Sequence, residues 1–337
     1  MPLSTLFRPV LAAAVIASAA MPASAFDQVV VFGDSLSDTG RLAALSSTLN
    51  LPGIGTVPAS PYVDGRFSNG MVAVEYLAQS LGLSGALTNY AYGGATSGLL
   101  NAHFGIDELI DPGLTAAALP LRNTGIQSQV GMFQADLAAA GKSASSSALY
   151  VVWGGANDFL YAPAEVYQSQ AAAISFIQGV VGNLVSSVQT LYAMGARNFL
   201  LPTLPDLGIT PRTMDLGAIE SGGATSLSWV FNTVLVNTYK GLASALPDER
   251  FYAFNTFLAS RDARASFANT SEACIATGDA KDCLGYMFFD DIHPTTATHA
   301  MLGAQMAAAV PEPHGVLLMA LGALVLLGHS ARRQRRA

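Results

Sequence analysis

A short apolar run that ends in Gly-Asp-Ser limits the possible folds of this chain more than any other stretch. The apolar residues Val29–Phe32 lead directly into Gly33-Asp34-Ser35, which is typical of a buried parallel strand that ends in a tight turn. Open α/β sheets bind their ligands beside such turns, at the carboxyl ends of the strands. Ser35 would place a hydroxyl there. Taken alone, however, these residues favour an ordinary turn in which the serine caps the next helix.

Segments of strand and helix character alternate along the rest of the chain. Strands are predicted at Asn89–Tyr92, Leu149–Trp153, Asn198–Leu201 and Phe251–Phe254, and helices at Val72–Leu81, Thr124–Ala140, Ala164–Met194, Leu227–Ala245 and Thr295–Ala309. Ser68 or Asn69 is expected to cap the first of these helices. The alternation predicts an α/β fold of three layers, with helices on both faces of a central, mostly parallel sheet. The proline-rich segment Asn50–Phe67 is predicted to be a long loop over the ligand-binding edge.

Three of the predicted strands run into turns that contain glycine. These turns are Gly33-Asp34-Ser35, Gly93-Gly94 and Gly154-Gly155-Ala156-Asn157, and in a parallel sheet they would share one edge. Acyl transfer needs a nucleophile and hydrogen-bond donors for the oxyanion. Ser35 can supply the nucleophile. Its own N–H, the N–H of Gly94 and the side-chain amide of Asn157 can converge as the donors.

The same chemistry needs a base, and His293 is the best candidate. The other histidines are less suited by position: His314 and His329 lie in the tail, His103 in a loop without an acid at a useful spacing, and His299 inside the predicted closing helix. Pro294 disfavours helix at His293 and so places it on a loop just before that helix. Asp290 can fold back to accept the Nδ1–H of His293 and fix its tautomer. Asp291 is the rival for this role.

Neither end of the chain is predicted to belong to the fold. Residues 1–25 contain Arg8, an apolar run and Ala23-Ser24-Ala25, which is the pattern of a cleaved secretory signal. We therefore expect export to the periplasm, the cell surface or the medium. Residues 310–337 contain Pro311-Glu312-Pro313, a short apolar run and a terminal arginine cluster. Residues 26–309 are left as one domain of a size common among α/β folds.

The C-terminal pattern resembles the bacterial PEP-CTERM sorting signal, which directs export and processing of the tail. This resemblance implies an exosortase-type processing machinery as a partner, and transient membrane association through residues 310–337. Basic residues stay on the cytoplasmic side, so the preceding domain would face outward. A plain C-terminal membrane anchor is the alternative.

The domain between the two ends is acidic and contains two cysteines. Five of the 16 basic residues and one of the 23 acidic residues lie in the end segments, so residues 26–309 carry 11 basic and 22 acidic side chains. This balance argues against nucleic acid and anionic lipid headgroups as partners. Cys274 and Cys283 are predicted to form one disulfide, because an even count in an exported chain favours pairing.

The chain resembles the GDSL lipases/esterases of the SGNH hydrolase superfamily over nearly all of residues 26–309. Four diagnostic positions occur in order: the serine of Phe32-Gly33-Asp34-Ser35-Leu36-Ser37-Asp38-Thr39-Gly40, the glycine Gly94 of Asn89-Tyr90-Ala91-Tyr92-Gly93-Gly94-Ala95, the asparagine of Gly154-Gly155-Ala156-Asn157-Asp158, and the histidine of Asp290-x-x-His293-Pro294. Gly65-Arg66-Phe67-Ser68-Asn69-Gly70 and the run 198–208 also match. The resemblance implies the flavodoxin-like SGNH hydrolase fold.

The resemblance also implies a mechanism. Ser35 would attack an ester carbonyl, His293 would take its proton and Asp290 would hold the imidazole. The N–H groups of Ser35 and Gly94 and the amide of Asn157 would stabilise the oxyanion. No metal or organic cofactor is expected, and Asp34 and Asp38 are expected to hold turn backbone.

Three functions remain open at this point. The first is an exported carboxylic ester hydrolase that acts on small-molecule or lipid esters. The second is an acetylesterase that acts on acylated sugars of extracellular polysaccharide. The third is a surface-matrix binding protein that keeps the fold without activity. The complete set of diagnostic residues argues against the third.

Overall fold

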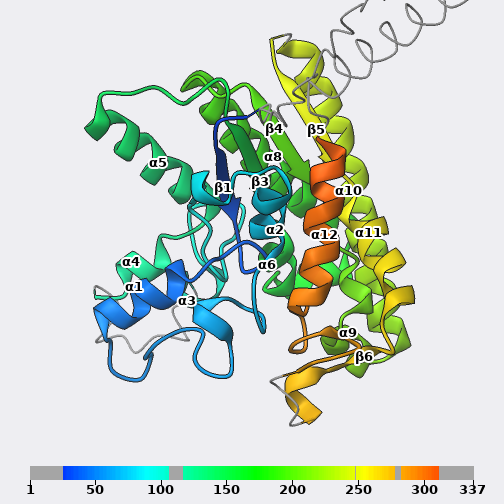
Figure 1. The fold of residues 1–337 in the computed structure, drawn as a ribbon. Helices are drawn as coiled ribbons and strands as arrows, with labels where there is room; N and C mark the ends of the chain where they lie inside the picture. Colours follow the sequence, from blue (N-terminus) through cyan, green and yellow to red (C-terminus); the bar gives the residue numbers. More distant parts are fainter. Residues whose placement is uncertain (1–25, 106–116, 247, 278–281, 311–337) are drawn as a thin grey trace, which may run out of the picture. The chain divides into compact units, whose positions relative to one another are not determined.

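Five parallel strands form the central sheet in the computed structural model, which describes residues 26–105, 117–246, 248–277 and 282–310. Their order across the sheet is β2-β1-β3-β4-β5, and a separate sheet pairs β6 with β7. The strands are β1 (Val29–Gly33), β2 (Leu87–Asn89), β3 (Leu149–Trp153), β4 (Asn198–Pro202), β5 (Arg250–Phe254), β6 (Asn269–Ala273) and β7 (Tyr286–Phe288). The predicted α/β fold with a mostly parallel sheet is therefore confirmed (Figure 1).

The strand order creates a point of reversal between β1 and β3. After β2, which lies on one side of β1, the chain crosses to β3 on the other side. Gly33 at the end of β1 is paired in register with Trp153 at the end of β3. Ligands of open α/β sheets bind outside the carboxyl ends of the strands at such a reversal. Ser35 and Asn157 follow these two strand ends directly.

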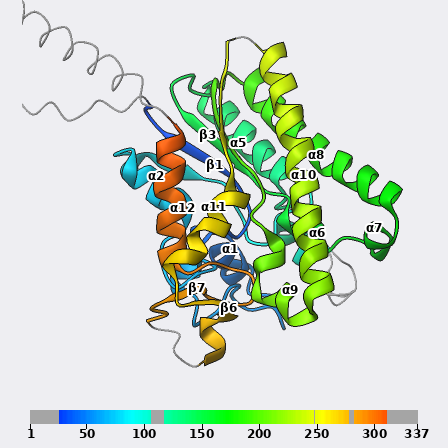
Figure 2. The same ribbon diagram turned by 90° about the vertical axis from the view of Figure 1, so that its right-hand side faces the viewer.

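Helices cover both faces of the sheet (Figure 2). The α-helices are α1 (Arg41–Leu49), α2 (Ala73–Ser80), α3 (Ala102–Gly105), α4 (Leu119–Arg122), α5 (Ile126–Ala140), α6 (Ala156–Leu160), α7 (Ala164–Gln168), α8 (Gln170–Ala193), α9 (Pro211–Leu216), α10 (Ala218–Ala245), α11 (Thr256–Ala263) and α12 (Thr296–Ala309). Short 3-10 turns are η1 (Val63–Gly65), η2 (Ser84–Ala86), η5 (Leu207–Ile209), η6 (Arg264–Ser266) and η7 (Cys274–Thr277).

The core lies between the sheet and these two helical layers. One layer contains α5, α8 and α10, whose apolar residues pack against alternate residues of the strands such as Val30 and Phe32. The other contains α2, α11 and α12 (Figure 2). Among the described residues, only α8 is long and apolar enough to cross a membrane. Its buried face, which includes Val181, Leu184 and Val188, belongs to the core of the domain.

Several element boundaries differ from the sequence predictions for identifiable reasons. The predicted helix 164–194 is divided by Ser169, whose backbone is extended and whose hydroxyl caps α8. Helix α10 begins nine residues before the predicted Leu227, because Gly222 and Gly223 are tolerated inside it. The strand predicted at Asn89–Tyr92 lies at Leu87–Asn89. The small β6–β7 sheet was missed because its strands are short and partly exposed.

The expected cap of α2 is wrong. The helix begins after Val72, whose N–H donates to Glu75 Oε2 at 2.9 Å. The Ser68 hydroxyl donates instead to the carbonyl of Pro294 at 2.9 Å, and Asn69 Oδ1 accepts the Thr296 N–H at 2.8 Å. Both side chains therefore join this segment to the start of α12.

Candidate active site

Ser35 lies in the turn after β1, and a buried glutamine holds the strand end in place. The Gly33 N–H donates to Gln129 Oε1 at 2.9 Å, and Gln129 Nε2 donates back to the Gly33 carbonyl at 2.8 Å. A Cβ at Gly33 would lie 2.7 Å from the Trp153 carbonyl oxygen, so only glycine fits there. Helix α1 begins at Arg41. Ser35 is therefore not a helix cap, and its side chain is available for other contacts.

His293 connects Ser35 to Asp290 through its two ring nitrogens. His293 Nε2 lies 2.8 Å from Ser35 Oγ, and Nδ1 lies 2.6 Å from Asp290 Oδ2. The backbone N–H groups of Ile292 and His293 donate to the other carboxylate oxygen, Oδ1, at 2.9 and 2.6 Å. The structure thus brings together three residues that the sequence selected, although Ser35 and His293 are 258 positions apart.

The two candidate acids have different partners. Asp290 is buried and contacts His293, whereas the half-exposed Asp291 forms an ion pair with Arg212 at 2.7 Å. Tyr62 also donates to Asp290 Oδ2, at 2.6 Å. Burial raises the pKa of Asp290, but the charge and hydrogen bond of His293, the Tyr62 hydroxyl and the His293 N–H together outweigh burial and hold it well below its usual value.

The three predicted oxyanion donors, Ser35, Gly94 and Asn157, line one cavity together with His293. Within the part of the chain that the structure describes, the N–H groups of Ser35 and Gly94 donate no hydrogen bond. Gly94 has a φ of 78°, and a Cβ there would lie 2.5 Å from Asn101 Oδ1, so glycine is required at this position. Asn157, at the start of α6, donates from Nδ2 to the Ala95 carbonyl at 3.1 Å.

Asp34 and Asp38 hold backbone, as expected from their place in the turn. Asp34 Oδ1 accepts the Leu36 N–H at 3.0 Å, and burial raises the pKa of Asp34 to about 7. The Asp38 carboxylate accepts the N–H groups of Gly40 and Arg41, and that of Gly93 at 2.8 Å. Asp38 therefore joins the loop that carries Gly94 to the turn that carries Ser35 through these hydrogen bonds.

Ser35 and His293 line two cavities. The narrower one, about 50 Å³, is mainly apolar and is lined by residues such as Trp153, Leu160 and Phe288. The wider one, about 270 Å³, is lined by polar and aromatic side chains that include Tyr161 and Arg212. A substrate with two different ends can therefore approach Ser35 with each end in a different environment.

Within the described residues, no three His, Cys, Asp or Glu side chains gather in a way that could hold a metal ion. The expectation that the reaction needs neither metal nor organic cofactor stays a prediction. The predicted disulfide joins Cys274 to Cys283. It packs against Phe289, the residue before Asp290.

Two aromatic residues beside Ser35 and His293 were not predicted from the sequence. Tyr62 and Phe67 both lie at the end of the loop predicted to cover the ligand-binding edge, and both line the wider cavity. The only signal was the match of residues 65–70 to the GDSL pattern. Nothing in the local sequence indicates that Tyr62 reaches a carboxylate 228 positions away.

An open parallel sheet with a Ser–His–Asp line at its point of reversal is the architecture of a hydrolase. The GDSL-like Lipase/Acylhydrolase family model matches residues 29–306, and the chain belongs to this family. It is therefore an ester hydrolase of the GDSL lipase/esterase type.

Relatives of known name share most of their length with this chain. A phosphatidylcholine-sterol acyltransferase from Aeromonas hydrophila is 26% identical, over 87% of this chain and 92% of the relative. A GDSL esterase/lipase from Arabidopsis thaliana is 25% identical, over 81% and 86%. Among solved structures, a member of the lipolytic protein G-D-S-L family from Veillonella parvula aligns with a TM-score of 0.42 and 13% identity, over 84% of this chain and 97% of that one.

Proposed function

We propose that this protein is an exported serine hydrolase of carboxylic esters that works through an acyl-enzyme on Ser35. The observation that carries the proposal is the continuous line from Asp290 through His293 to Ser35, with contacts of 2.6 and 2.8 Å. Ser35 lines both cavities, so an ester bound in either of them can bring its carbonyl to the serine.

In the proposed reaction, Ser35 Oγ attacks the ester carbonyl carbon while His293 Nε2 takes its proton. Asp290 accepts the Nδ1–H and stabilises the imidazolium. The negative charge on the carbonyl oxygen is met by the N–H groups of Ser35 and Gly94 and by the amide of Asn157. Collapse breaks the bond to the alcohol, which leaves with the proton from His293. Water then attacks the acyl-enzyme with the same base and releases the acid.

Ser35→Ala tests this mechanism, and Ser37→Ala is its matched control. Both serines are buried in the same turn, but within the described chain the Ser37 hydroxyl has no hydrogen-bond partner. Ser35→Ala should lower kcat by at least about 10³-fold with Tm preserved, because only binding and the oxyanion donors remain. Ser37→Ala should keep kcat within about twofold.

The assay should use p-nitrophenyl esters of increasing chain length together with acetylated sugars. A clear preference for acetylated sugars would favour the acetylesterase alternative. An active Ser35→Ala variant would exclude the acyl-enzyme proposed here. Lack of activity of the folded wild-type protein on every ester would favour a binding protein.

Export and sorting belong to the same proposal. The secretory pattern of residues 1–25 lies outside the described residues, and so does the PEP-CTERM pattern of residues 310–337 apart from Val310. The disulfide between Cys274 and Cys283 supports export, because such bonds persist in oxidising compartments.

A further inference from the structure

Tyr62 shares with His293 the carboxylate oxygen that orients the base. The Tyr62 hydroxyl and His293 Nδ1 each lie 2.6 Å from Asp290 Oδ2, whereas the two backbone N–H donors bind Oδ1. Among the described residues, Tyr62 is the hydrogen-bond partner of the Asp290 carboxylate that comes from outside the segment 290–293. Rotation of the carboxylate would break the Tyr62 contact as well as the His293 contact.

Aromatic packing fixes where the Tyr62 hydroxyl points. Its ring meets the ring of Phe289 edge-on at 5.2 Å and that of Phe67 at 5.9 Å. The Phe67 ring lies 5.1 Å from the imidazole of His293, and it fills the space where Gly93 would carry a Cβ. Tyr62 and Phe67 together thus contact Asp290, His293 and the loop that carries Gly94.

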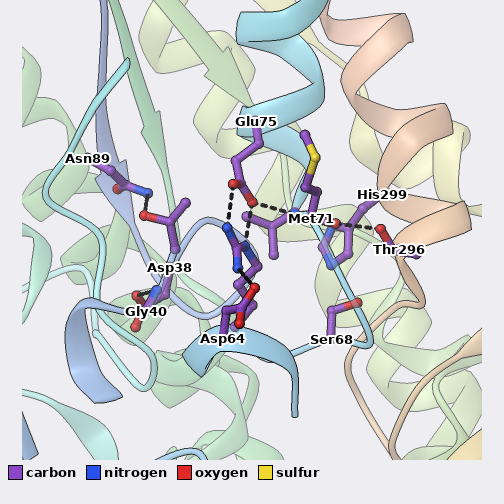
Figure 3. Close-up of polar contacts among 12 residues, drawn as sticks. Asp38, Gly40, Asp64, Ser68, Met71, Glu75, Asn89, Thr296 and His299 are labelled. Atoms are coloured by element: carbon purple, nitrogen blue, oxygen red, sulfur yellow. Dashed lines mark hydrogen bonds and ion pairs between the residues drawn. The ribbon is translucent and has the colours of Figure 1, made fainter. Parts of the chain in front are cut away.

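The segment that carries this pair is attached to two helices. Arg66 forms two hydrogen bonds of 2.8 Å with the Glu75 carboxylate on α2, and an ion pair of 3.2 Å with Asp64. The Thr296 hydroxyl at the start of α12 donates to the Met71 carbonyl at 2.9 Å. Figure 3 shows Asp64 of this segment and Glu75 of α2, together with the contact between Met71 and Thr296. The position of Tyr62 is therefore set by the scaffold and not by a free loop.

We propose that Tyr62 is a positioning residue of the ester-hydrolysing site, which acts through Asp290 by holding its Oδ2 toward His293 and limiting the charge on that oxygen. The inference rests on the proposed function. It makes the segment 62–67 a part of the machinery that aligns the base, in addition to a wall of the substrate cavity.

Tyr62→Phe removes only the hydroxyl, and Tyr90→Phe is its matched control. Tyr90 also donates to a carboxylate at 2.6 Å, that of Asp136, which is not among the residues that line the two cavities. Tyr62→Phe should lower kcat about 10-fold with KM little changed, because Asp290 Oδ2 is no longer held toward His293 when the imidazole takes the proton. Tyr90→Phe should leave kcat within about twofold.

The pH profile separates positioning from a structural effect. Without the Tyr62 donor, Oδ2 carries more charge and stabilises the protonated imidazole more strongly, so the acid limb of kcat/KM should move to higher pH. The other charged or titratable groups near His293 include Asp34, His299 and the ion pair Asp291–Arg212. Asp291 and Arg212 act on Tyr62 through their opposite charges and do not hydrogen-bond to its hydroxyl. Tyr90→Phe should not move the limb.

A double-mutant cycle tests whether Tyr62 acts through Asp290. In an Asp290→Asn background, Tyr62→Phe should cause no further loss of kcat. An unchanged kcat and pH profile in Tyr62→Phe, or an equal loss in both backgrounds, would overturn the inference. Ser35→Ala is assayed in parallel. If it is active, the proposed function fails; if it is inactive while Tyr62→Phe behaves as wild type, only this inference fails.

Discussion

At the scale of the residue, Asn157 has two possible roles that mutation can separate. Its Nδ2 holds the Ala95 carbonyl beside Gly94, which is a structural contact, and its amide also lines the cavity at Ser35. If it donates to the oxyanion, Asn157→Ala removes about 2.7–4 kcal/mol of transition-state stabilisation. We expect kcat to fall roughly 10²–10³-fold, with KM little changed and Tm nearly preserved.

Asn183→Ala is the control for this measurement. Asn183 lies on α8, and its Nδ2 holds Ser97, in the same connection that carries Ala95, at 3.1 Å. This variant should lower Tm without a large change in kcat. A lower Tm with normal turnover in Asn157→Ala would instead show that Asn157 only supports the loop.

The residues that the sequence identified are those whose chemistry follows from the end of a strand or from a short local spacing. Ser35 follows β1, Asn157 follows β3, and Asp290 is one turn before His293. The contact of Tyr62 with Asp290 and the pairing of Arg212 with Asp291 could not be predicted, because each depends on how two segments far apart in the sequence meet. No periodicity or capping pattern encodes such a meeting.

At the scale of the element, the contact between α2 and α12 depends on a buried histidine. His299 is fully buried on α12, and its Nδ1 accepts the Ala73 N–H at the start of α2 at 3.2 Å. Burial, with a smaller contribution from the charge of His293, lowers the pKa of His299 to about 3. Between pH 6.5 and 3, His299 therefore binds a proton in the unfolded chain but not in the folded chain. Stability from this group is complete above pH 6.5 and falls as the pH drops.

His299→Asn tests this dependence, because its side-chain oxygen can replace Nδ1 as the acceptor. Below pH 6.5 the wild type should lose up to about 1.4 kcal/mol of unfolding free energy per pH unit relative to the variant. Urea unfolding at several pH values measures the difference. Burial raises the pKa of Asp34 to about 7 and that of Asp38 to about 6, so protonation of these two groups in acid stabilises the folded state. This opposite effect is the same in both proteins, and comparing them isolates the contribution of His299. Parallel curves for the two proteins would contradict the assignment.

The same pair of helices shows where prediction of elements reaches its limit. Helix α12 was predicted to within one residue, as Thr295–Ala309, and in the structure Thr295 caps its start. The cap of α2 was predicted wrongly, since Ser68 and Asn69 have the residue types of caps but bind the start of α12 instead. A local pattern cannot tell which of two partners a polar side chain will choose.

At the scale of the whole molecule, the catalytic set and the C-terminal segment are expected to be separable. The described domain continues to Val310, which is buried and follows α12. We expect a chain that ends after Val310 to keep the kcat/KM and Tm of the full chain and to leave the membrane fraction. Fractionation of exporting cells, followed by assay of each fraction, measures this. A truncated protein that folds without activity, or that stays with the membrane, would contradict the separation.

The distance along the chain between Ser35 and His293 also has a consequence for the timing of biosynthesis. A growing chain that has been synthesised as far as α10 already contains Ser35 and the three proposed oxyanion donors, but it still lacks His293, the proposed base. The set becomes complete only when the last part of the domain has emerged and α12 has docked beside α2. A nascent chain therefore carries Ser35 without its proposed base until the last part of the domain has been made, so the proposed site cannot hydrolyse an ester during most of synthesis.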